Sequence, residues 1–275
     1  MSLSVVIVNY NTRDLLRDCL QSLKNSTIAP EVIVVDNASS DGSPAMVADE
    51  FPGVRLLAQS ENTWFCGGNN IGICVATGKY VLLLNPDTAV APDALEKLVA
   101  HMDAHPETAG VTAQLHYPGG EIQRTCSRIP TFAYLLAQHT VLGMIFPAWR
   151  GRLADHHWYR DENFTREHTR EVEVLPGSCL LMRREDILLN GALKLYFPED
   201  DLARRFRGRR FYFLADAKIT HREKSSTHSW LATRIYFEDM LIYTRTHHGW
   251  WRMALLWLLS CPLYGAMWVK AKMKV

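Results

Sequence analysis

Residues 80–87 read Tyr80-Val81-Leu82-Leu83-Leu84-Asn85-Pro86-Asp87, an apolar run that ends in a carboxylate. An unbroken apolar run of this length is typical of a strand that is buried on both faces, as in a parallel sheet. Asp87 would then lie at the carboxyl end of the strand, the edge of an open α/β sheet where ligands bind. A carboxylate at this edge can hold a divalent cation against a diphosphate. Because Asn-Pro-Asp is also an ordinary turn sequence, this interpretation depends on the rest of the chain.

The composition indicates a globular protein and excludes several functional classes. The chain has 275 residues, of which 48% are hydrophobic and 21% charged. Lys and Arg number 30 against 29 Asp and Glu, a balance that does not favour nucleic acid as a partner. The six cysteines include no Cys-x-x-Cys pair, so we expect reduced thiols in a cytoplasmic protein rather than a disulfide scaffold or a zinc site. The N-terminus runs directly into a strand-like segment, and we expect no secretion signal.

Strand-like and helix-like segments alternate through the first half of the chain. The predicted strands are Leu3–Val8, Glu31–Val35, Val54–Leu57 and Tyr80–Leu84. The predicted helices cover residues 12–25, 44–50, 67–77 and 92–105. This alternation predicts an α/β fold with a doubly wound, mostly parallel sheet flanked by helices.

The pattern is looser after about Gly110. We expect strands at 111–116, 171–175 and 211–214 and helices at 200–207 and 230–246, with an irregular segment at 150–170. We therefore predict a catalytic domain over residues 1–228, with a nucleotide-binding half (1–110) and an acceptor-binding half (111–228). Residues 229–275 are predicted to form a C-terminal helical segment.

Polar side chains stand at three predicted strand ends, which converge on one crevice in a parallel sheet. They are Asn9 with Asn11, Asp36 and Asp87. The chain has neither a Gly-rich dinucleotide fingerprint nor a Walker loop, so phosphates would be neutralised by a cation and by basic side chains. Asp36 could accept a hydrogen bond from a pyrimidine N–H or a ribose hydroxyl, or it could cap the loop at residues 37–42.

A second acidic cluster, Glu199-Asp200-Asp201, follows the aromatic segment Leu195–Phe197 and precedes Arg204. Adjacent carboxylates repel one another, although a helix N-terminus stabilises negative charge. One of them could act as general base towards a sugar hydroxyl. His221 lies among basic and hydroxyl groups that include Lys224, so it is a candidate contact for a metal or a diphosphate.

Five segments in order resemble family 2 inverting glycosyltransferases of the GT-A fold, in the rhamnosyltransferase-like branch. They are Val5–Asn11, Val35–Ser43, Glu61-Asn62, Gly67–Gly72 and Leu84–Asp87. The resemblance covers roughly residues 3–226. It implies a nucleotide-diphosphate-sugar donor such as a dTDP- or UDP-sugar, and Mg²⁺ or Mn²⁺ as the cofactor.

The resemblance also assigns roles to the candidate residues. It implies that Asp87 binds the metal and that His221 lies near the diphosphate. From the surroundings of His221 we also predict it as a second metal ligand. The expected donor contacts are Asn9, Asn11, Asp36, Asn62, Asn69, Asn85, Arg204 and Lys224. It places the catalytic base among Glu199, Asp200 and Asp201.

The chain departs from the family pattern at two places. Where the family often has Asn-x-Gly-Phe, this chain has Trp64 in place of the glycine. The family's Glu-Asp-x-Asp-Leu motif reads Pro198-Glu199-Asp200-Asp201-Leu202 here. Counting back from Leu202 makes Glu199 the base, whereas the Glu-Asp pair taken as a unit makes it Asp200, which we favour.

The C-terminal segment is apolar, aromatic and basic. Residues 253–269 carry no formal charge, Lys270 and Lys272 follow, and no acidic residue occurs after Asp239. Because Pro262 and Gly265 weaken a straight spanning helix, we expect a segment that lies in the membrane interface. A core helix that covers the sheet, or an oligomer contact, is the alternative.

These observations predict a metal-dependent inverting glycosyltransferase at the cytoplasmic face of the membrane. Its acceptor would be a saccharide or a lipid-linked saccharide in bacterial cell-surface polysaccharide synthesis. A nucleotidyltransferase is a rival, but it would carry a Gly-rich basic loop after the first strand. A catalytically inactive module that binds a nucleotide sugar or a carbohydrate is the other alternative.

Overall fold

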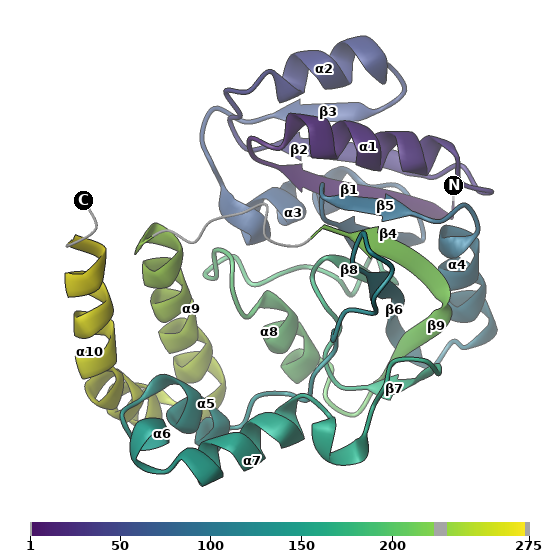
Figure 1. The fold of residues 1–275 in the computed structure, drawn as a ribbon. Helices are drawn as coiled ribbons and strands as arrows, with labels where there is room; N and C mark the ends of the chain where they lie inside the picture. The colour runs from purple at the N-terminus through teal and green to yellow at the C-terminus, as the bar shows by residue number, and fades with distance from the viewer. Residues whose placement is uncertain (1, 223–229, 273–275) are drawn as a thin grey trace.

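The computed structural model describes residues 2–222 and 230–272, and it contains one mixed sheet flanked by helices (Figure 1). The strand order is β3-β2-β1-β4-β8-β6-β9-β5, and β7 pairs with β9. The strands are β1 Leu3–Asn9, β2 Glu31–Asp36, β3 Arg55–Ala58, β4 Tyr80–Leu84, β5 Thr88–Val90, β6 Thr108–His116, β7 Arg170–Val172, β8 Cys179–Arg183 and β9 Arg210–His221. Strands β1 to β4 are mutually parallel, whereas β8 runs antiparallel to both β4 and β6.

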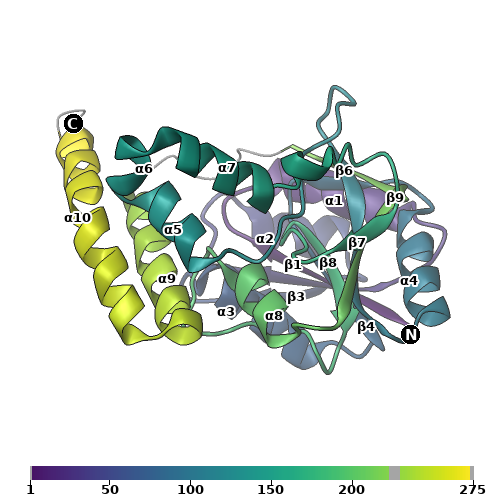
Figure 2. The same cartoon turned by 90° about the horizontal axis from the view of Figure 1, so that it is seen from below.

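Helices cover both faces of this sheet, and two of them form a hairpin at its side (Figure 2). They are α1 Arg13–Lys24, α2 Ser43–Glu50, α3 Trp64–Val75, α4 Ala94–Ala104, α5 Phe132–His139, α6 Leu142–Ile145, α7 Pro147–His157, α8 Pro198–Arg205, α9 Trp230–His248 and α10 Trp250–Lys272, with a 3₁₀ turn at Arg160–Glu162. The predicted mixed α/β architecture with a C-terminal helix is confirmed.

Alternating side chains of the central strands pack into two cores. In β1, Val5 and Ile7 lie in the core shared with α1, α2 and α4, whereas Val6 lies in the core shared with α3, α8 and α9. Burying a large aliphatic side chain stabilises the fold by about 1.5–3 kcal/mol. The unbroken apolar runs in β1 and β4 therefore reflect strands buried on both faces, as expected.

Several predicted boundaries were wrong. Strand β8 was missed because its four-residue apolar run, Cys179–Met182, does not distinguish a strand from a buried helix. Strand β9 continues past Leu214 through a register shift against β6. This continuation was missed because the polar Asp216 interrupts the alternation that a strand normally shows. Helix α7 occupies part of the segment expected to be irregular, and β5 was not foreseen.

The predicted division of the chain can be placed on these elements. The boundary between residues 110 and 111 falls inside β6, and the two halves share one sheet. At the C-terminus, α10 continues through Pro262 as one helix, whereas we expected Pro262 and Gly265 to weaken it.

Gly72 lets α3 approach the sheet closely, which generates a stability prediction. A Cβ added at Gly72 would lie 2.3 Å from Cγ1 of Val6, a stiff side chain in the core. We expect Gly72→Ala to destabilise the protein by about 1–3 kcal/mol, despite the better helix propensity of alanine. Urea unfolding measures the change.

Gly53→Ala is the matched control, because nothing lies within 4 Å of the added atom. It should change the stability by less than about 0.5 kcal/mol. Equal stability of the two variants would contradict the close approach of α3.

Candidate functional site

The ends of β1 and β2 form a buried hydrogen-bonded pair. Asn9 Nδ2 donates to Asp36 Oδ1 at 2.8 Å, and the Ser39 amide donates to Asp36 Oδ2 at 2.9 Å. Thr12 Oγ1 donates to Asn9 Oδ1 at 2.6 Å. These contacts match the loop-capping alternative for Asp36, and its donor-binding role stays a prediction.

The other candidate asparagines also hydrogen-bond within the protein near this edge. Asn11 Oδ1 accepts from the Ser40 amide, and Asn69 Nδ2 donates to the Phe65 carbonyl. The Asn85 amide donates to the Ser178 carbonyl at 3.1 Å. The structure thus brings these residues to the strand ends without testing their contact with a donor.

Trp64 stands where the resembled family has glycine, and its backbone adopts a conformation that favours glycine. Its φ angle is +62°, in the left-handed region that L side chains rarely adopt. Asn62 Oδ1 accepts from the Trp64 amide, and Asn37 Nδ2 donates to the Trp64 carbonyl. Two asparagine side chains therefore hold the tryptophan in a conformation that suits glycine.

Asp87 and His221 meet at the carboxyl edge of the sheet. His221 ends β9, which pairs with β5 through Thr88, the residue after Asp87. His221 Nε2 lies 3.4 Å from Asp87 Oδ1, and both side chains are buried. The two predicted metal ligands are thus neighbours, although they are far apart in sequence.

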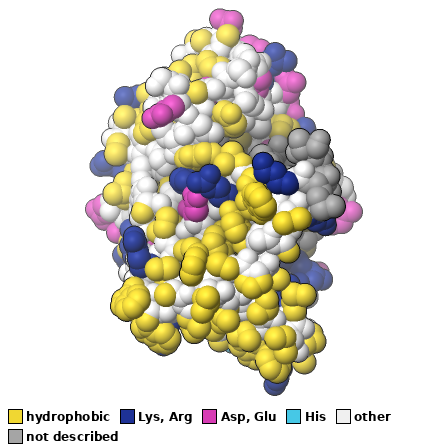
Figure 3. All heavy atoms as spheres, turned by 90° about the vertical axis from the view of Figure 1, so that its left-hand side faces the viewer, with side chains coloured by type: hydrophobic (Ala, Val, Ile, Leu, Met, Phe, Trp, Pro, Cys, Tyr) yellow, Lys and Arg dark blue, Asp and Glu magenta, His cyan; other side chains and the backbone are white. Residues whose placement is uncertain are grey.

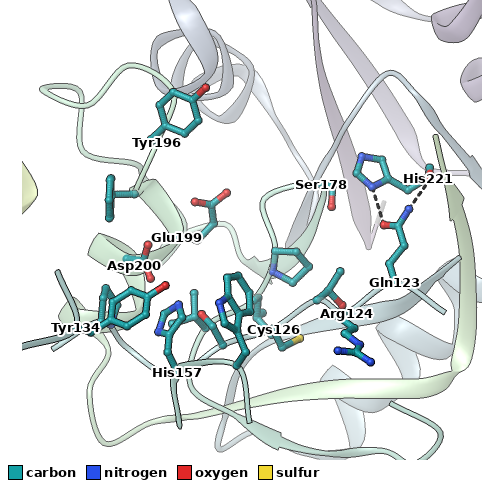
Figure 4. A pocket seen from close by; sticks show the side chains of 18 of the residues that line it. Gln123, Arg124, Cys126, Tyr134, His157, Ser178, Tyr196, Glu199, Asp200 and His221 are labelled. Atoms are coloured by element: carbon teal, nitrogen blue, oxygen red, sulfur yellow. Dashed lines mark hydrogen bonds between the residues drawn. The ribbon is translucent and has the colours of Figure 1, made fainter. Parts of the chain in front are cut away.

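Gln123 determines which nitrogen of His221 carries the hydrogen. Gln123 Nε2 donates to the His221 carbonyl at 2.6 Å, and Gln123 Oε1 lies 2.9 Å from His221 Nδ1 (Figure 4). A carbonyl oxygen only accepts, so the amide NH₂ must face it and Oε1 must face Nδ1. Neutral His221 therefore carries its hydrogen on Nδ1 and presents the Nε2 lone pair towards Asp87.

This arrangement fits a divalent cation. A carboxylate oxygen and an imidazole nitrogen that lie 3.4 Å apart are both of a type that binds divalent cations in proteins. The mixed oxygen and nitrogen ligands suit Mn²⁺ better than Mg²⁺, which prefers oxygen. In the part of the chain that the structure describes, no group of three or more His, Cys, Asp or Glu residues could hold a metal. Asp87 and His221 would therefore supply only part of the coordination.

A cavity of about 410 Å³ opens beside this cluster (Figure 4). Its walls come from the segment between β6 and α5, from α5, the end of α7, the loop before β8, the start of α8, β9 and α9. The lining side chains that matter below are Gln123, Tyr134, His157, Ser178, Tyr196, Glu199, Asp200, His221 and Tyr236. His221 therefore belongs both to the candidate metal site and to the cavity.

Two carboxyl groups in the cavity are poorly solvated. Burial raises the pKa of Glu199 to about 7, while the Gly177 amide partly opposes this by hydrogen bonding. Burial and the neighbouring Glu199 charge raise the pKa of Asp200 to about 8. Carboxyl groups that titrate near neutral pH in a cavity are suited to proton transfer.

Asp201 and Arg204 point to other partners. Asp201 does not line the cavity, and its carboxylate contacts His247 Nε2 at 2.8 Å and Arg205 Nε at 3.1 Å. Arg204 donates to the Tyr243 hydroxyl and the Pro130 carbonyl. Both residues fasten α8 to its surroundings, so the catalytic role of Asp201 and the donor contact of Arg204 stay predictions without support from this geometry. Lys224 lies outside the described residues.

Helix α9 is part of the site. Tyr236 lines the cavity, and the buried Asp239 accepts from the backbone amides of Lys194, Leu195 and Tyr196 at 2.8–3.2 Å. These bonds fix the segment that leads into α8. The predicted C-terminal segment 229–275 therefore contains one helix that builds the site and a second that lies outside it.

Several lining residues were missed by sequence reasoning. Gln123, Tyr134, His157 and Tyr236 come from segments without a recognisable motif, and only the fold brings them together. The rings of Tyr134 and His157 stack at 4.0 Å between centroids. Burial lowers the pKa of His157 to about 4, so this ring is neutral and serves as an aromatic wall.

Comparisons with known proteins agree with this geometry. A family model described as "Glycosyl transferase family 2" matches residues 4–187. "N-acetylglucosaminyl-diphospho-decaprenol L-rhamnosyltransferase" from Mycobacterium tuberculosis is 27% identical over 284 residues, which cover 95% of this chain and 90% of the relative. "Succinoglycan biosynthesis protein ExoO" from Rhizobium meliloti is 37% identical over 101 residues, covering 36% of this chain and 29% of that protein.

Solved structures support the fold. GalNAc-T7 with UDP, GalNAc and Mn²⁺ has a TM-score of 0.65 at 14% identity, over 89% of this chain and 48% of that one. The mannosyltransferase PcManGT from Pyrobaculum calidifontis, in complex with GDP-Man and Mn²⁺, has a TM-score of 0.57 at 17% identity. The match covers 98% of this chain and 75% of that one. These likenesses confirm the expected GT-A fold.

The anchoring role of Asp239 can be tested by substitution. Asp239→Asn turns an NH₂ group or a weaker acceptor towards three amide donors, and we expect a loss of roughly 2–4 kcal/mol in unfolding free energy. The adjacent Glu238→Gln is the matched control, since Glu238 forms ion pairs with Lys194 and Arg234 at the surface. It should change the stability by less than about 1 kcal/mol. Equal losses in urea unfolding would contradict the anchoring role.

Proposed function

This chain belongs to glycosyl transferase family 2 and is a glycosyltransferase, and we propose that it uses a nucleotide-diphosphate sugar to glycosylate a saccharide or lipid-linked acceptor. The observation that carries this proposal is the shared cavity: Glu199 and Asp200 line it together with His221, which faces Asp87. A base for the acceptor and a cation site for the diphosphate thus border one space. Release of nucleoside diphosphate from dTDP- and UDP-sugars, measured with and without Mn²⁺, tests the proposal, since a mere binding module would release none.

The name of the Mycobacterium tuberculosis relative supports rhamnose or another hexose as the sugar, and a lipid diphosphate as part of the acceptor. We propose dTDP or UDP as the nucleotide. The reaction would serve bacterial cell-surface polysaccharide synthesis, such as lipopolysaccharide, O-antigen or exopolysaccharide assembly.

We assign the base to Glu199 rather than to Asp200. Glu199 accepts from the Gly177 amide, next to Ser178, and an added Cβ at Gly177 would lie 1.9 Å from Glu199 Oε1. Figure 4 shows Asp200 towards Tyr134, with Glu199 on the side of Ser178 and His221. Counting back from Leu202 also selects Glu199, because Asp201 is held by His247 and Arg205 as a structural residue.

The reaction is a single inverting displacement. The acceptor hydroxyl gives its proton to Glu199 and its oxygen bonds to the anomeric carbon, while the bond from that carbon to the diphosphate breaks on the opposite face. A divalent cation held by Asp87 and His221 would neutralise charge on the leaving diphosphate. Tyr134, Tyr196 and Tyr236 line the cavity on the side that we assign to the acceptor.

Glu199→Gln should lower kcat by roughly 10²–10⁴ with little change in donor KM, because the general base is lost and the donor site is kept. Asp200→Asn, the matched neighbour, should lower kcat less. In the wild type, kcat should rise with pH through about 7, since the base must be ionised. A larger loss in Asp200→Asn would return the assignment to Asp200.

Glu199→Gln should also stabilise the folded protein at alkaline pH. The folded pKa of Glu199 lies above its unfolded value, so folded Glu199 holds its proton longer and stability falls as pH rises towards about 7. Glu199→Gln removes this penalty. It should raise Tm relative to the wild type at pH 8 and much less at pH 5, and an equal shift at both values would contradict this account.

Gln123→Leu tests how His221 is oriented. Without the amide oxygen, Nδ1 loses the partner that fixes its hydrogen, and Mn²⁺ affinity measured by electron paramagnetic resonance should fall by about 10–100-fold. Gln123→Glu keeps an acceptor for Nδ1–H and should retain more affinity. The exposed Gln21→Leu on α1 is the control. Unchanged affinity in Gln123→Leu would refute the role of Gln123.

Helix α10 is the one helix in the described residues that is long and apolar enough to cross a membrane. Little of it is buried, and it exposes Trp250, Trp251, Trp257 and Trp268. Tryptophan favours the membrane interface, and Lys270 and Lys272 suit an anionic lipid surface. We propose that the protein is cytoplasmic and contacts the inner membrane peripherally through α10.

A further inference from the structure

The corner between α5 and α7 exposes three large apolar side chains in a row. Met144, Ile145 and Phe146, at the end of α6, are 66%, 62% and 55% exposed. Scattered exposed apolar residues are normal on soluble proteins, but a contiguous group indicates a contact surface. We call these three residues the α6 tip.

Contacts from α5 and from the start of α6 join the region of the α6 tip to α10. The Val141 amide, at the start of α6, donates to the Leu259 carbonyl of α10 at 3.5 Å. The ring of Phe132 on α5 meets the ring of Trp251 edge-on at 6.3 Å between centroids, and the Arg252 guanidinium lies over the Phe132 ring. Figures 1 and 2 both place α6 beside α10, and Figure 3 shows apolar side chains gathered over this side of the molecule.

Charge selects the partner of this surface. The chain has no acidic residue after Asp239, whereas α10 carries Arg252, Lys270 and Lys272. Helix α7, which follows the tip, adds Arg150 and Arg152 against the single acidic Asp155. A second copy of this chain would bring like charges together, whereas an anionic bilayer would attract them.

We propose that the α6 tip inserts into the interface of an anionic lipid bilayer beside the exposed face of α10. This inference rests on the proposed membrane contact of α10 and adds a second anchor. The helices that flank the tip carry Tyr134 and His157, which wall the cavity. The two anchors therefore hold the acceptor side of the cavity at the lipid surface, where a lipid-linked acceptor is found.

The test compares single glutamate substitutions in the full chain. Ile145→Glu places a carboxylate on the tip, Leu258→Glu places one on α10, and Leu188→Glu is the control, at a residue that is 52% exposed and lies in neither helix. Binding is measured by flotation with vesicles of phosphatidylcholine that contain phosphatidylglycerol, and with phosphatidylcholine alone. Circular dichroism and Tm verify that each variant folds.

We expect wild type and Leu188→Glu to bind the anionic vesicles equally, and Ile145→Glu to bind at least about tenfold more weakly through lost burial and added repulsion. Wild-type binding by Ile145→Glu, or an equal loss in Leu188→Glu, would overturn the inference. Loss of binding only in Leu258→Glu would leave α10 as the sole anchor and overturn the inference. Loss of binding only in Ile145→Glu would leave the α6 tip as an anchor and contradict the proposed membrane contact of α10. A wild-type dimer that Ile145→Glu converts to a monomer, with vesicle binding unchanged, would assign the surface to a second copy.

Discussion

The antiparallel ladder between β4 and β8 is the constraint on which the site depends. It pairs Leu84 with Cys179, and the next residues remain joined because the Asn85 amide donates to the Ser178 carbonyl. From this junction the chain leads to Asp87 on one side and back to Gly177, which contacts Glu199, on the other. The separation between the candidate cation site and the candidate base is therefore set by strand register. A shift by one residue would turn every side chain of β8 to the opposite face.

Four carboxylates around α8 show how packing divides structural from chemical roles. Asp239 receives three backbone amides and Asp201 receives a histidine, an arginine and an asparagine, so both are buried with partners. Glu199 and Asp200 are half-buried in the cavity wall with far fewer partners, and desolvation raises their pKa values. Asp239 and Asp201 thus stabilise the segment that holds Glu199 and Asp200 in place. Buried groups left short of partners are typical of active sites, where stability is given up for reactivity.

The first half of the fold could be predicted because its signals are local. Strands β1, β2 and β4 each contain a continuous apolar run with a polar residue at or just beyond its carboxyl end, so Asn9, Asp36 and Asp87 could be placed at one edge from the sequence. Their partners could not. The pairing of Asp87 with His221 could not be predicted from spacing, since 119 residues separate the end of β5 from the start of β9. Gln123 and the lining tyrosines Tyr134 and Tyr236 belong to no recognisable sequence motif, because the wall of a cavity is formed by side chains from several separate elements.

The choice between Glu199 and Asp200 illustrates where sequence reasoning ends. The family match stops at residue 187, before α8 begins at Pro198, so the match itself cannot align the acidic motif. Motif spacing alone left two interpretations, because counting back from Leu202 selects Glu199 whereas the Glu-Asp pair taken as a unit selects Asp200. The choice matters because adjacent helical residues point in directions about 100° apart. What separates them is the environment: Asp201 is fixed by α9, and this fixes the rotation of α8 about its axis. With that rotation set, Glu199 contacts Gly177 beside the β8 junction and Asp200 lies against the aromatic wall, so the contacts of α9 place the reactive carboxylate.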